Sequence, residues 1–411
     1  MESVVIIGAG HAGVQVAESL RTGGFEGAVT LVGDEDALPY QRPPLSKDYL
    51  APGRTAEPLP LRGEKFYAEN RIELRTGVTA TVLDRARRTV FLDDGESLTY
   101  TTLVLATGAT NRTLPVPGSD LAGVHDLRTL ADAERLRADM EKARSVAVVG
   151  AGFIGLEFAA AARAHGLAVT VLEATDRPMG RALTPPMSAH FADAHGEMGS
   201  DLRLGEGLAE IHGQDGRVTG VSSGPGAEYP ADIVLIGVGV RPRDELAVAA
   251  GLAVNNGIVV DGHLRTSDPD VYAIGDCASF PATEAGARLR LESVQNATDQ
   301  ARHVARQILG SPATYAEVPW FWSNQGPLRL QIAGLAQPGD STVISGDRSG
   351  GRFSVLAFRN GALVAVESLN KPADHIAARR VLSAAATPTP DQAADPSFTL
   401  KDFAKQLVAA P

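Results

Sequence analysis

The sequence predicts an α/β protein with two βαβ units and a smaller C-terminal α+β domain. Two segments of the form Gly-x-Gly-x-x-Gly carry this prediction, residues 8–13 after the apolar run Ser3–Ile7 and residues 150–155 after the run Ser145–Val149. Each segment opens an alanine-rich stretch with helical spacing, so each lies where a strand turns into a helix. Beyond residue 319, apolar and polar residues alternate, which is typical of antiparallel strands. We therefore expect two Rossmann-like units followed by a domain of different architecture.

The glycines of these two segments, called here the first and second fingerprint, have separate tasks. The first glycine forms the turn, the second lets the backbone approach a pyrophosphate, and the third allows close packing of helix on strand. The pyrophosphate then meets the N–H groups and the positive dipole end of the helix. The glycines are Gly8, Gly10 and Gly13 in the first fingerprint and Gly150, Gly152 and Gly155 in the second. One copy also fits an ordinary glycine-rich turn, whereas two copies predict two dinucleotide sites and electron transfer between them.

The remaining elements follow as short apolar runs bounded by turn residues. We expect further strands at residues 28–32, 102–106, 169–172, 233–236 and 271–276, and helices at 130–142 and 294–309. A proline-rich excursion covers residues 39–47. Strands at residues 352–358 and 362–367 are joined by Asn360-Gly361, a dipeptide typical of tight hairpins. Residues 384–396, rich in Ala, Pro, Asp and Thr, are expected to form an extended surface connection.

The composition is that of a globular protein without a nucleic-acid or membrane partner. Its 411 residues are 44% hydrophobic and 21% charged, which suits two or three domains. The formal net charge is −11 and no dense Lys/Arg run occurs, so nucleic-acid binding is not expected. No apolar run approaches the roughly 18 residues of a membrane span, and the first strand begins without a basic leader. We expect a cytoplasmic protein that is a monomer or weak dimer.

Cysteine and histidine usage limits the possible chemistry. The chain has one cysteine, Cys277, so it cannot form an internal disulfide, a Cys-x-x-Cys pair or a thiolate metal cluster. Its histidines lack metal-ligand spacing, and no metal site is predicted. His11, within the first fingerprint, is interpreted as a packing or hydrogen-bonding residue.

Acidic residues after the second strand of each βαβ unit predict how the dinucleotides are distinguished. Glu173 lies 23 positions after Gly150, where a carboxylate accepts hydrogen bonds from ribose hydroxyls and repels a 2′-phosphate. This predicts NADH rather than NADPH, although Arg177 and Arg181 nearby would suit a 2′-phosphate. The alternative is a solvated carboxylate at the strand end. In the first unit, Asp34 and Glu35 are both candidates, and the sequence does not choose between them.

Several longer motifs carry a family resemblance over nearly the full chain. They are the two fingerprints, Arg42-Pro43-Pro44-Leu45-Ser46-Lys47, Ala106-Thr107-Gly108, Gly275-Asp276-Cys277, residues 292–297 and Pro319-Trp320-Phe321-Trp322-Ser323. With them the chain resembles the two-dinucleotide flavoprotein reductases, in particular the putidaredoxin reductase-like ferredoxin reductases of bacterial cytochrome P450 and ring-hydroxylating dioxygenase systems. The resemblance implies a glutathione-reductase-like fold. Its parts would be an FAD-binding domain of residues 1–112 and 240–315, an NAD-binding domain of residues 113–239 and a C-terminal α+β domain of residues 316–411.

The same resemblance implies the residues that bind FAD and NADH. Besides the six fingerprint glycines they are Ala12, Asp34, Arg42, Lys47, Ala80, Ala106, Thr107, Gly108, Arg128, Ile154, Glu157, Glu173, Arg181, Gly237, Gly275, Asp276, Val294 and Trp320. Asp276 resembles the ligand of the FAD ribityl chain. The helix that begins near Val294 would place its positive end at the flavin pyrimidine edge, where reduction adds negative charge.

Lys47, Glu157 and Trp320 are the residues that the resemblance brings closest to the chemistry. Lys47 would place a positive charge beside the flavin, unless it is only an exposed loop lysine. Glu157, expected on the first turn of its helix, would face the nicotinamide, or else be stabilised there by the helix dipole alone. Trp320 and Trp322 would wall a flavin or nicotinamide ring, with core packing as the alternative.

The absence of a second cysteine narrows the possible functions. Disulfide reductases and cysteine-dependent oxidases of related fold need a redox thiol, and Cys277 is interpreted as a small buried residue. Electrons from NADH would therefore leave singly to an external [2Fe–2S] ferredoxin, with docking arginines at 288, 290, 302 and 306. The alternatives are a rubredoxin reductase, a cysteine-independent NADH oxidase and a small-radical reductase. A binding or signalling flavoprotein of the apoptosis-inducing-factor type is disfavoured because the basic surface of that group is missing.

Overall fold

The computed structural model describes residues 2–53, 59–282, 287–384 and 387–409. Contacts between Cα atoms divide the chain into two compact units. The first unit comprises the described residues of Met1–Gln41, Pro58–Thr110 and Val240–Glu317, and the second those of Arg42–Glu57, Asn111–Gly239 and Val318–Pro411. The division into FAD-binding, NAD-binding and C-terminal domains stays a prediction.

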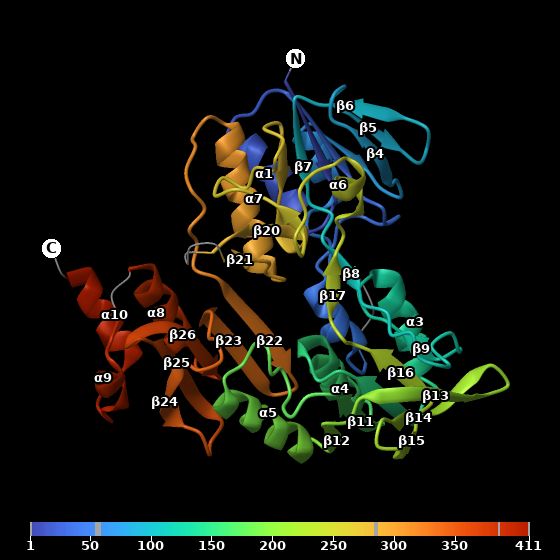
Figure 1. Ribbon diagram of the computed structural model, residues 1–411, viewed down its shortest axis with the longest axis vertical. Coiled ribbons are helices and arrows are strands. Elements are labelled where there is room, and N and C mark those ends of the chain that lie inside the picture. Colours follow the sequence, from blue (N-terminus) through green and yellow to red (C-terminus); the bar gives the residue numbers. More distant parts are fainter. Residues whose placement is uncertain (1, 54–58, 283–286, 385–386, 410–411) are drawn as a thin grey trace. The chain divides into compact units, whose positions relative to one another are not determined.

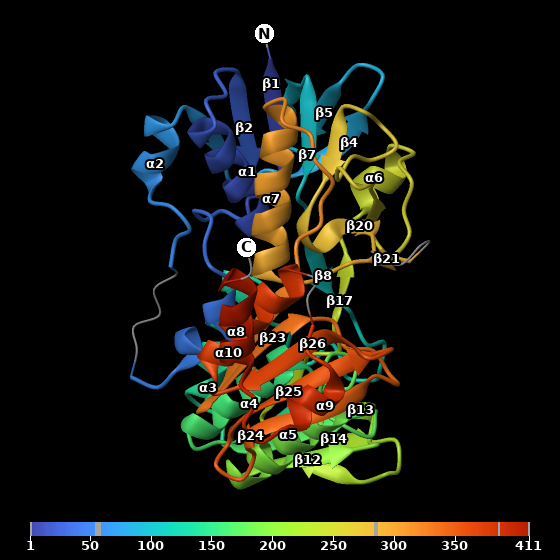
Figure 2. The same cartoon turned by 90° about the vertical axis from the view of Figure 1, so that its left-hand side faces the viewer.

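The first unit is built on a parallel five-stranded sheet in the order β19-β7-β1-β2-β3. The strands are β1 (Ser3–Ile7), β2 (Ala28–Val32), β3 (Ile72–Arg75), β7 (Thr102–Leu105) and β19 (Val271–Ala273). Helices α1 (His11–Thr22) and α7 (Val294–Ile308) lie side by side and share a hydrophobic core with the sheet (Figure 2). Burial of β1, β2, β7 and β19 explains why their sequences are mostly apolar, whereas β3 at the sheet edge carries Glu73 and Arg75.

Smaller elements complete the first unit. They are α2 (Glu64–Glu69), α6 (Glu245–Ala249), the 3-10 helix η3 (Gly275–Cys277), the antiparallel sheet of β4 (Ala80–Asp84), β5 (Thr89–Leu92) and β6 (Ser97–Thr99), and the sheet of β18 (Ile258–Val259), β20 (Ala278–Pro281) and β21 (Arg288–Leu289). Strands β8 (Ala109–Asn111) and β17 (Val240–Pro242) form a separate two-stranded sheet.

The second unit contains a second parallel sheet, in the order β12-β11-β10-β16-β9. Its strands are β9 (Val124–His125), β10 (Ser145–Val149), β11 (Ala168–Glu173), β12 (Ser200–Leu204) and β16 (Ile233–Ile236). The other elements of this part are α3 (Leu130–Met140), α4 (Phe153–Ala164), α5 (Pro185–Glu197), the 3-10 helices η1 (Pro43–Ser46) and η2 (Asp48–Leu50), and the antiparallel strands β13 (Leu208–Gln214), β14 (Arg217–Ser223) and β15 (Glu228–Pro230) (Figure 1).

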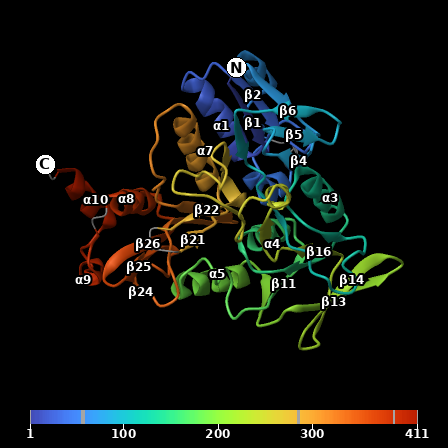
Figure 3. The same cartoon turned by 45° about the horizontal axis from the view of Figure 1, so that its top comes forward.

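An antiparallel sheet in the order β22-β23-β26-β25-β24 belongs to the same unit. It consists of β22 (Trp320–Gln325), β23 (Leu328–Gly334), β24 (Ser341–Asp347), β25 (Arg352–Arg359) and β26 (Ala362–Leu369), and it is accompanied by α8 (Pro372–Ser383), α9 (Pro390–Ala394) and α10 (Leu400–Ala409). Helix α8 packs on β23 and β26. Helix α4 lies beside β22 (Figure 3). This contact places Glu157 of α4 against β22 of the antiparallel sheet.

Most predicted elements are confirmed, with two corrections. The hairpin is confirmed, since Asn360 and Gly361 both have positive φ, 52° and 79°, between β25 and β26. The expected strand at residues 271–276 is shorter, because the backbone turns into η3 at Gly275. The extended connection at residues 384–396 is wrong for Pro390–Ala394, which forms α9 behind a capping box at Thr389. Residues 385 and 386 of that segment lie outside the described residues.

Within the described residues, no helix combines the length and apolar character that crossing a bilayer requires.

Glu367 on β26 predicts a pH-dependent stability. Its oxygens accept hydrogen bonds from the backbone N–H and the hydroxyl of Thr184, at 2.7 and 2.5 Å. Burial raises the pKa of Glu367 from 4.5 to about 7. The stabilisation from the bound proton is therefore complete below about pH 4.5 and is lost as the pH rises towards 7. Glu367→Gln should remove roughly 3 kcal/mol of that pH dependence, measured by urea unfolding across this range; an unchanged slope would contradict the assignment.

Candidate functional site

The first fingerprint forms the turn between β1 and α1. Gly8 has a φ of +112°, and a Cβ there would stand 2.1 Å from the carbonyl oxygen of Ala106; a Cβ on Gly13 would stand 1.9 Å from the carbonyl oxygen of Gly8. Both positions therefore require glycine for the fold itself. Gly10 differs, because a Cβ there would meet nothing within 4 Å. The space in front of Gly10 is open at the N-terminus of α1, where a pyrophosphate would bind.

Other predicted cofactor residues of the first unit meet at this turn. Gly275 faces Ala12, whose Cβ would lie 3.4 Å from a Cβ on Gly275, and the Gly275 N–H donates to Gln300 Oε1 at 2.7 Å. Asp276 follows in η3, against the first turns of α7, which begins at Val294. Thr107, between Ala106 and Gly108 at the end of β7, donates its hydroxyl to the carbonyl of Arg243 at 2.6 Å. Ala80 lies apart from these residues in sequence and fold, at the start of β4.

Both acidic candidates after β2 have side-chain partners. Arg243 Nη1 lies 2.6 Å from Asp34 Oδ2, and the Tyr40 hydroxyl donates to Glu35 Oε2 at 2.5 Å. Asp34 is the more exposed of the two. Which of them holds the ribose stays a prediction.

The second fingerprint repeats the geometry of the first between β10 and α4. Gly150 has a φ of +101°, and a Cβ there would stand 2.6 Å from the carbonyl oxygen of Gly237, while a Cβ on Gly155 would stand 2.2 Å from that of Gly150. At Gly152 the nearest atom would be 4.0 Å away, again the carbonyl oxygen of Gly237. Ile154, on the first turn of α4, is exposed. The middle glycine thus faces open space in both fingerprints.

Glu173, at the end of β11, lies against the second fingerprint. Its Oε2 accepts from the Ala151 N–H at 2.8 Å, and its Oε1 accepts from the N–H and hydroxyl of Thr175 at 2.9 and 2.8 Å. Arg177 donates to the carbonyls of Gly180 and Leu183. Arg181 is exposed and forms no ion pair within the described part of the chain. Glu173 is therefore not the merely solvated carboxylate of the alternative interpretation.

A buried ion pair joins Lys47 and Glu157 in the second unit. Lys47 Nζ lies 2.6 Å from Glu157 Oε2, and the two side chains are 15% and 2% exposed. The hydroxyl of Ser46 donates to the same oxygen at 2.6 Å, and that of Ser323 donates to Glu157 Oε1 at 2.6 Å. Lys47 Nζ also donates to the carbonyl of Pro43 at 2.9 Å. Lys47 is thus not an exposed loop lysine, and Glu157 receives donors from both sides.

Glu157 does not lie on the first helical turn, contrary to the sequence-based expectation. Helix α4 begins at Phe153, so Glu157 is its fifth residue, and the first turn contains no acidic side chain. The effect of a helix dipole falls off within the first turn. The hydrogen bonds from Ser46 and Ser323 and the ion pair with Lys47 therefore account for the position of this carboxylate.

Trp320 and Trp322 share one face of β22, on which Trp320 packs against His375 of α8. Their rings lie 5.6 Å apart, and the Arg379 guanidinium stands 4.5 Å from the Trp320 ring centre. Both tryptophans are partly exposed, so simple core packing does not describe them. Elsewhere in this unit Arg42 Nη1 donates to the carbonyl of Arg128 at 2.8 Å, which brings those two predicted residues together.

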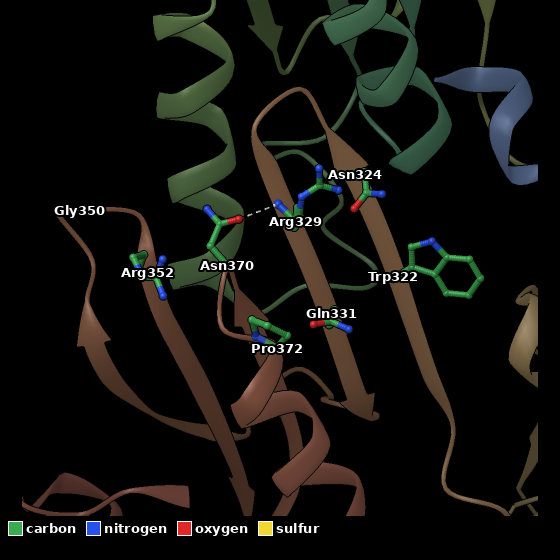
Figure 4. A pocket seen from close by; sticks show the side chains of 8 residues that line it. All are labelled: Trp322, Asn324, Arg329, Gln331, Gly350, Arg352, Asn370 and Pro372. Carbon is green, nitrogen blue, oxygen red and sulfur yellow. Dashed lines mark hydrogen bonds between the residues drawn. The ribbon is translucent and has the colours of Figure 1, made fainter. Parts of the chain in front are cut away.

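The same face of β22 borders an open polar hollow, shown in Figure 4. The hollow is lined by Trp322, Asn324, Arg329, Gln331, Gly350, Arg352, Asn370 and Pro372. Asn370 Oδ1 accepts from the Arg329 N–H at 3.1 Å. Arg329 and Arg352 are exposed, and among the described residues their guanidinium groups have neither an ion pair nor a hydrogen bond. The hollow thus presents two uncompensated positive charges.

The predicted docking arginines are only partly available to a partner. Arg288 donates to the carbonyls of Val260 and Ser279, and Arg290 pairs with Glu292 at 2.7 Å with its side chain 8% exposed. These two arginines therefore have partners within the fold, and their docking role stays a prediction. Arg302 and Arg306 on α7 are exposed, although Arg302 pairs with Asp299 at 3.0 Å.

Cys277 is fully buried in η3. Its thiol lies 3.2 Å from the carbonyl oxygen of Ile274, and burial raises the pKa of this thiol. A buried neutral thiol is a poor nucleophile. This agrees with the interpretation of Cys277 as a small packing residue.

Comparison with known families assigns both parts of the chain. Residues 2–301 match the pyridine nucleotide-disulphide oxidoreductase family, and residues 320–404 match the reductase C-terminal family. The chain belongs to the pyridine nucleotide-disulphide oxidoreductases. Members of this family are FAD-dependent oxidoreductases that use NAD(H), so the predicted cofactors and fold class are confirmed.

Relatives within the pyridine nucleotide-disulphide oxidoreductases match over nearly the whole chain. Rhodocoxin reductase of Rhodococcus erythropolis is 51% identical over 399 residues, which are 97% of this chain and 93% of that protein. The crystal structure of the ferredoxin reductase for the CYP199A2 system from Rhodopseudomonas palustris has a TM-score of 0.96 at 48% identity, over 98% of this chain and 100% of that one. That of the covalent putidaredoxin reductase–putidaredoxin complex has a TM-score of 0.94 at 39% identity, over 100% and 98% of the two chains. The resemblance read from the motifs is confirmed.

The two fingerprints fit FAD and NAD(H) on their own geometry. Each provides an open position at its middle glycine, Gly10 or Gly152, in front of a helix N-terminus, while the flanking glycines are packed. A backbone surface of this shape accommodates a pyrophosphate but would be narrowed by any side chain at the middle position.

Sequence reasoning missed several side chains that contact the predicted site residues. Ser46 and Ser323 donate hydrogen bonds to Glu157, and Arg243 forms an ion pair with Asp34. Gln325 is hydrogen-bonded to Ser323, and His195 is hydrogen-bonded to Gln325. Ser46 and Ser323 stand in the motifs of residues 42–47 and 319–323, but a sequence motif does not say which carboxylate a serine meets.

Proposed function

We propose that this chain is an NADH-dependent ferredoxin reductase that supplies a cytochrome P450 or an aromatic-ring dioxygenase. The observation that carries the proposal is a chain with two complete dinucleotide fingerprints whose one thiol, Cys277, is buried and neutral. Electrons that arrive from NADH then have no internal dithiol to reduce. The names of similar proteins support the same assignment, since they include the ferredoxin reductase for the CYP199A2 system, ferredoxin--NAD(+) reductase components of two dioxygenase systems, and a putidaredoxin reductase in complex with putidaredoxin.

In this proposal the first fingerprint binds FAD and the second binds NADH. FAD is also held by Ala12, Asp34 or Glu35, residues 106–108, Gly275-Asp276 and Val294. NADH is also held by Glu173 and Gly237. Lys47 and Glu157 act beside the reacting rings, Lys47 towards the flavin and Glu157 towards the nicotinamide. When bound, the flavin accepts two electrons from NADH and releases them singly, so one NADH reduces two ferredoxins. The fixed charge of Lys47 favours the added negative charge, as does the N-terminus of α7.

The carrier decides between this proposal and its alternatives. The purified holoprotein is mixed with NADH and a [2Fe–2S] ferredoxin, a rubredoxin or no carrier, and cytochrome c reduction is followed. We expect reduction to depend on the ferredoxin. Equal or faster turnover with rubredoxin would favour a rubredoxin reductase, and rapid NADH oxidation without any carrier would favour an oxidase.

We also propose that the enzyme is cytoplasmic and is a monomer or weak dimer. Cell fractionation tests the location, and sedimentation tests the oligomeric state.

The preference for NADH over NADPH is expected to depend on Glu173. Its carboxylate lies at the turn of the second fingerprint and would repel a 2′-phosphate, whereas the unpaired Arg181 would attract one. Glu173→Gln should lower the NADH/NADPH ratio of kcat/KM about tenfold, because loss of one repulsion of this kind is worth roughly 1.4 kcal/mol. Arg181→Gln is the matched control and should raise the ratio. A wild-type preference for NADPH would contradict the role of Glu173.

Ferredoxin docking is expected to be electrostatic. Two exposed surfaces offer positive charge, Arg302 with Arg306 on α7 and Arg329 with Arg352 at the polar hollow. Long-range attraction of an acidic ferredoxin is screened by salt, so its kcat/KM should fall steeply between about 0.05 and 0.5 M salt while ferricyanide reduction stays constant. Charge reversal of the true docking pair should remove that salt dependence, and reversal of the other pair should not. Equal salt dependence with both acceptors would contradict electrostatic docking.

A further inference from the structure

A chain of buried polar side chains leads away from Glu157 into the second unit. Ser323 Oγ donates to Glu157 Oε1 at 2.6 Å, Gln325 Nε2 lies 3.1 Å from Ser323 Oγ, and His195 Nε2 lies 2.8 Å from Gln325 Oε1. Ser323, Gln325 and His195 are all 0% exposed. Ser323 and Gln325 are two positions apart on β22 and therefore share the face that contacts Glu157 of α4, while Trp322 and Asn324 lie on the other face and line the hollow of Figure 4.

The direction of each hydrogen bond follows from the carboxylate. Glu157, paired with Lys47, offers only acceptors, so Ser323 must give it its single hydroxyl proton. Ser323 Oγ then accepts from the Gln325 amide N–H, which turns the amide carbonyl towards His195. His195 consequently donates from Nε2, and its Nδ1 is left without a partner among the described residues. Burial lowers the pKa of His195, which agrees with a neutral ring holding its proton on Nε2.

All three donors therefore point towards Glu157. Aligned hydrogen bonds in a buried environment polarise one another, so the Ser323–Glu157 bond is strengthened by the two bonds behind it. On the other side, Lys47 and Ser46 hold Oε2. With one oxygen fixed by residues of the η1 region and the other by β22, the carboxylate has a single orientation.

We propose that Ser323, Gln325 and His195 are positioning residues that fix the orientation of the Glu157 carboxylate for flavin reduction by NADH. The proposal rests on the role given above to Glu157. Without the Ser323 hydroxyl, Oε1 loses its donor and the carboxylate rotates about its one remaining anchored oxygen. A misplaced carboxylate in the reacting site slows flavin reduction, while the affinity for the nicotinamide dinucleotide changes little.

The experiment is a double-mutant cycle with Ser323→Ala and Glu157→Gln in the FAD-loaded protein. The rate constant for flavin reduction by NADH is measured by stopped flow, the Kd for NAD⁺ by equilibrium titration, and Tm by thermal unfolding. Ser354→Ala is the matched control, because Ser354 on β25 is also 0% exposed and donates to Asp374 Oδ2 of α8 at 2.9 Å. If Ser323→Ala and Ser354→Ala lose comparable Tm, a slower flavin reduction in Ser323→Ala alone reports positioning rather than stability.

We expect Ser323→Ala to slow flavin reduction about tenfold in the wild-type background and less than twofold in the Glu157→Gln background, with an NAD⁺ Kd within about twofold of wild type. The Tm loss caused by Ser323→Ala should likewise shrink when Glu157 is Gln, and Ser354→Ala should slow flavin reduction in neither background. An equal slowing by Ser323→Ala in both backgrounds, or none in the wild type, would overturn the positioning role while leaving Glu157 in place. No effect of Glu157→Gln itself would overturn the role of Glu157 and this proposal with it.

Discussion

Replacing Gly8 with alanine is expected to destabilise the protein even without FAD. The φ of +112° is strained for any L-residue, and the new Cβ would stand 2.1 Å from the carbonyl oxygen of Ala106, a backbone atom that cannot move aside. Backbone strain and overpacking each cost about 1–3 kcal/mol, so a loss of roughly 3 kcal/mol in unfolding free energy is expected from urea unfolding of the apoprotein.

Gly10→Ala is the matched control for Gly8→Ala. Gly10 has an extended backbone, and its added Cβ would meet nothing within 4 Å. The unfolding free energy of the apoprotein should therefore stay within about 0.5 kcal/mol of wild type, whereas the Kd for FAD should rise at least tenfold, or about 1.4 kcal/mol, because the methyl group occupies pyrophosphate space. Unchanged FAD affinity in Gly10→Ala would contradict the assignment of the first fingerprint.

Lys47→Met should produce the largest loss at the redox site. The substitution leaves Glu157 buried without its cation, and breaking a buried pair from one side costs about 3 kcal/mol or more. Loss of a fixed charge beside the reacting rings should also slow flavin reduction by NADH roughly 100-fold. Both effects are measured on one preparation, by urea unfolding and stopped flow.

Two comparisons test the origin of these losses. Adding Glu157→Gln to Lys47→Met should restore part of the stability, because the unpaired buried charge is removed, but should not restore the rate. Lys371→Met breaks a partly buried pair with Asp374 at the start of α8 and should leave flavin reduction unchanged. A Lys47→Met protein that reduces its flavin at the wild-type rate would refute the role of Lys47.

The fold was largely predictable from sequence, because its turns, strands and hairpin are specified by residues adjacent in the chain. The fingerprints, the apolar runs and Asn360-Gly361 each fix a turn, strand or hairpin through residues adjacent in the chain, and they correspond to β1–α1, β10–α4 and β25–β26. The segment of residues 384–396 was harder, because its prolines suit an extended chain and the first turn of a helix alike. The capping box at Thr389 decided for the helix at Pro390–Ala394.

The candidate site was predictable residue by residue but not as a network. Lys47, Glu157 and Ser323 stand in three separate motifs, and their spacing in the sequence does not predict that Lys47 and Ser323 both contact Glu157. For Arg288 and Arg290 the positive charge was evident from the sequence, but their internal partners were not. Their charge suggested an exposed docking surface, whereas their guanidinium groups serve backbone carbonyls and Glu292 within the fold.

In the proposed function, electrons pass from NADH to an external one-electron carrier without help from a thiol. The most direct measurement is an anaerobic titration of the holoprotein with limiting NADH and excess [2Fe–2S] ferredoxin, made with the wild type and with Cys277→Ala. We expect two ferredoxins to be reduced for each NADH oxidised, at the same rate in both proteins. Loss of ferredoxin reduction in Cys277→Ala with FAD still bound, or NADH oxidation that leaves the ferredoxin oxidised, would contradict it.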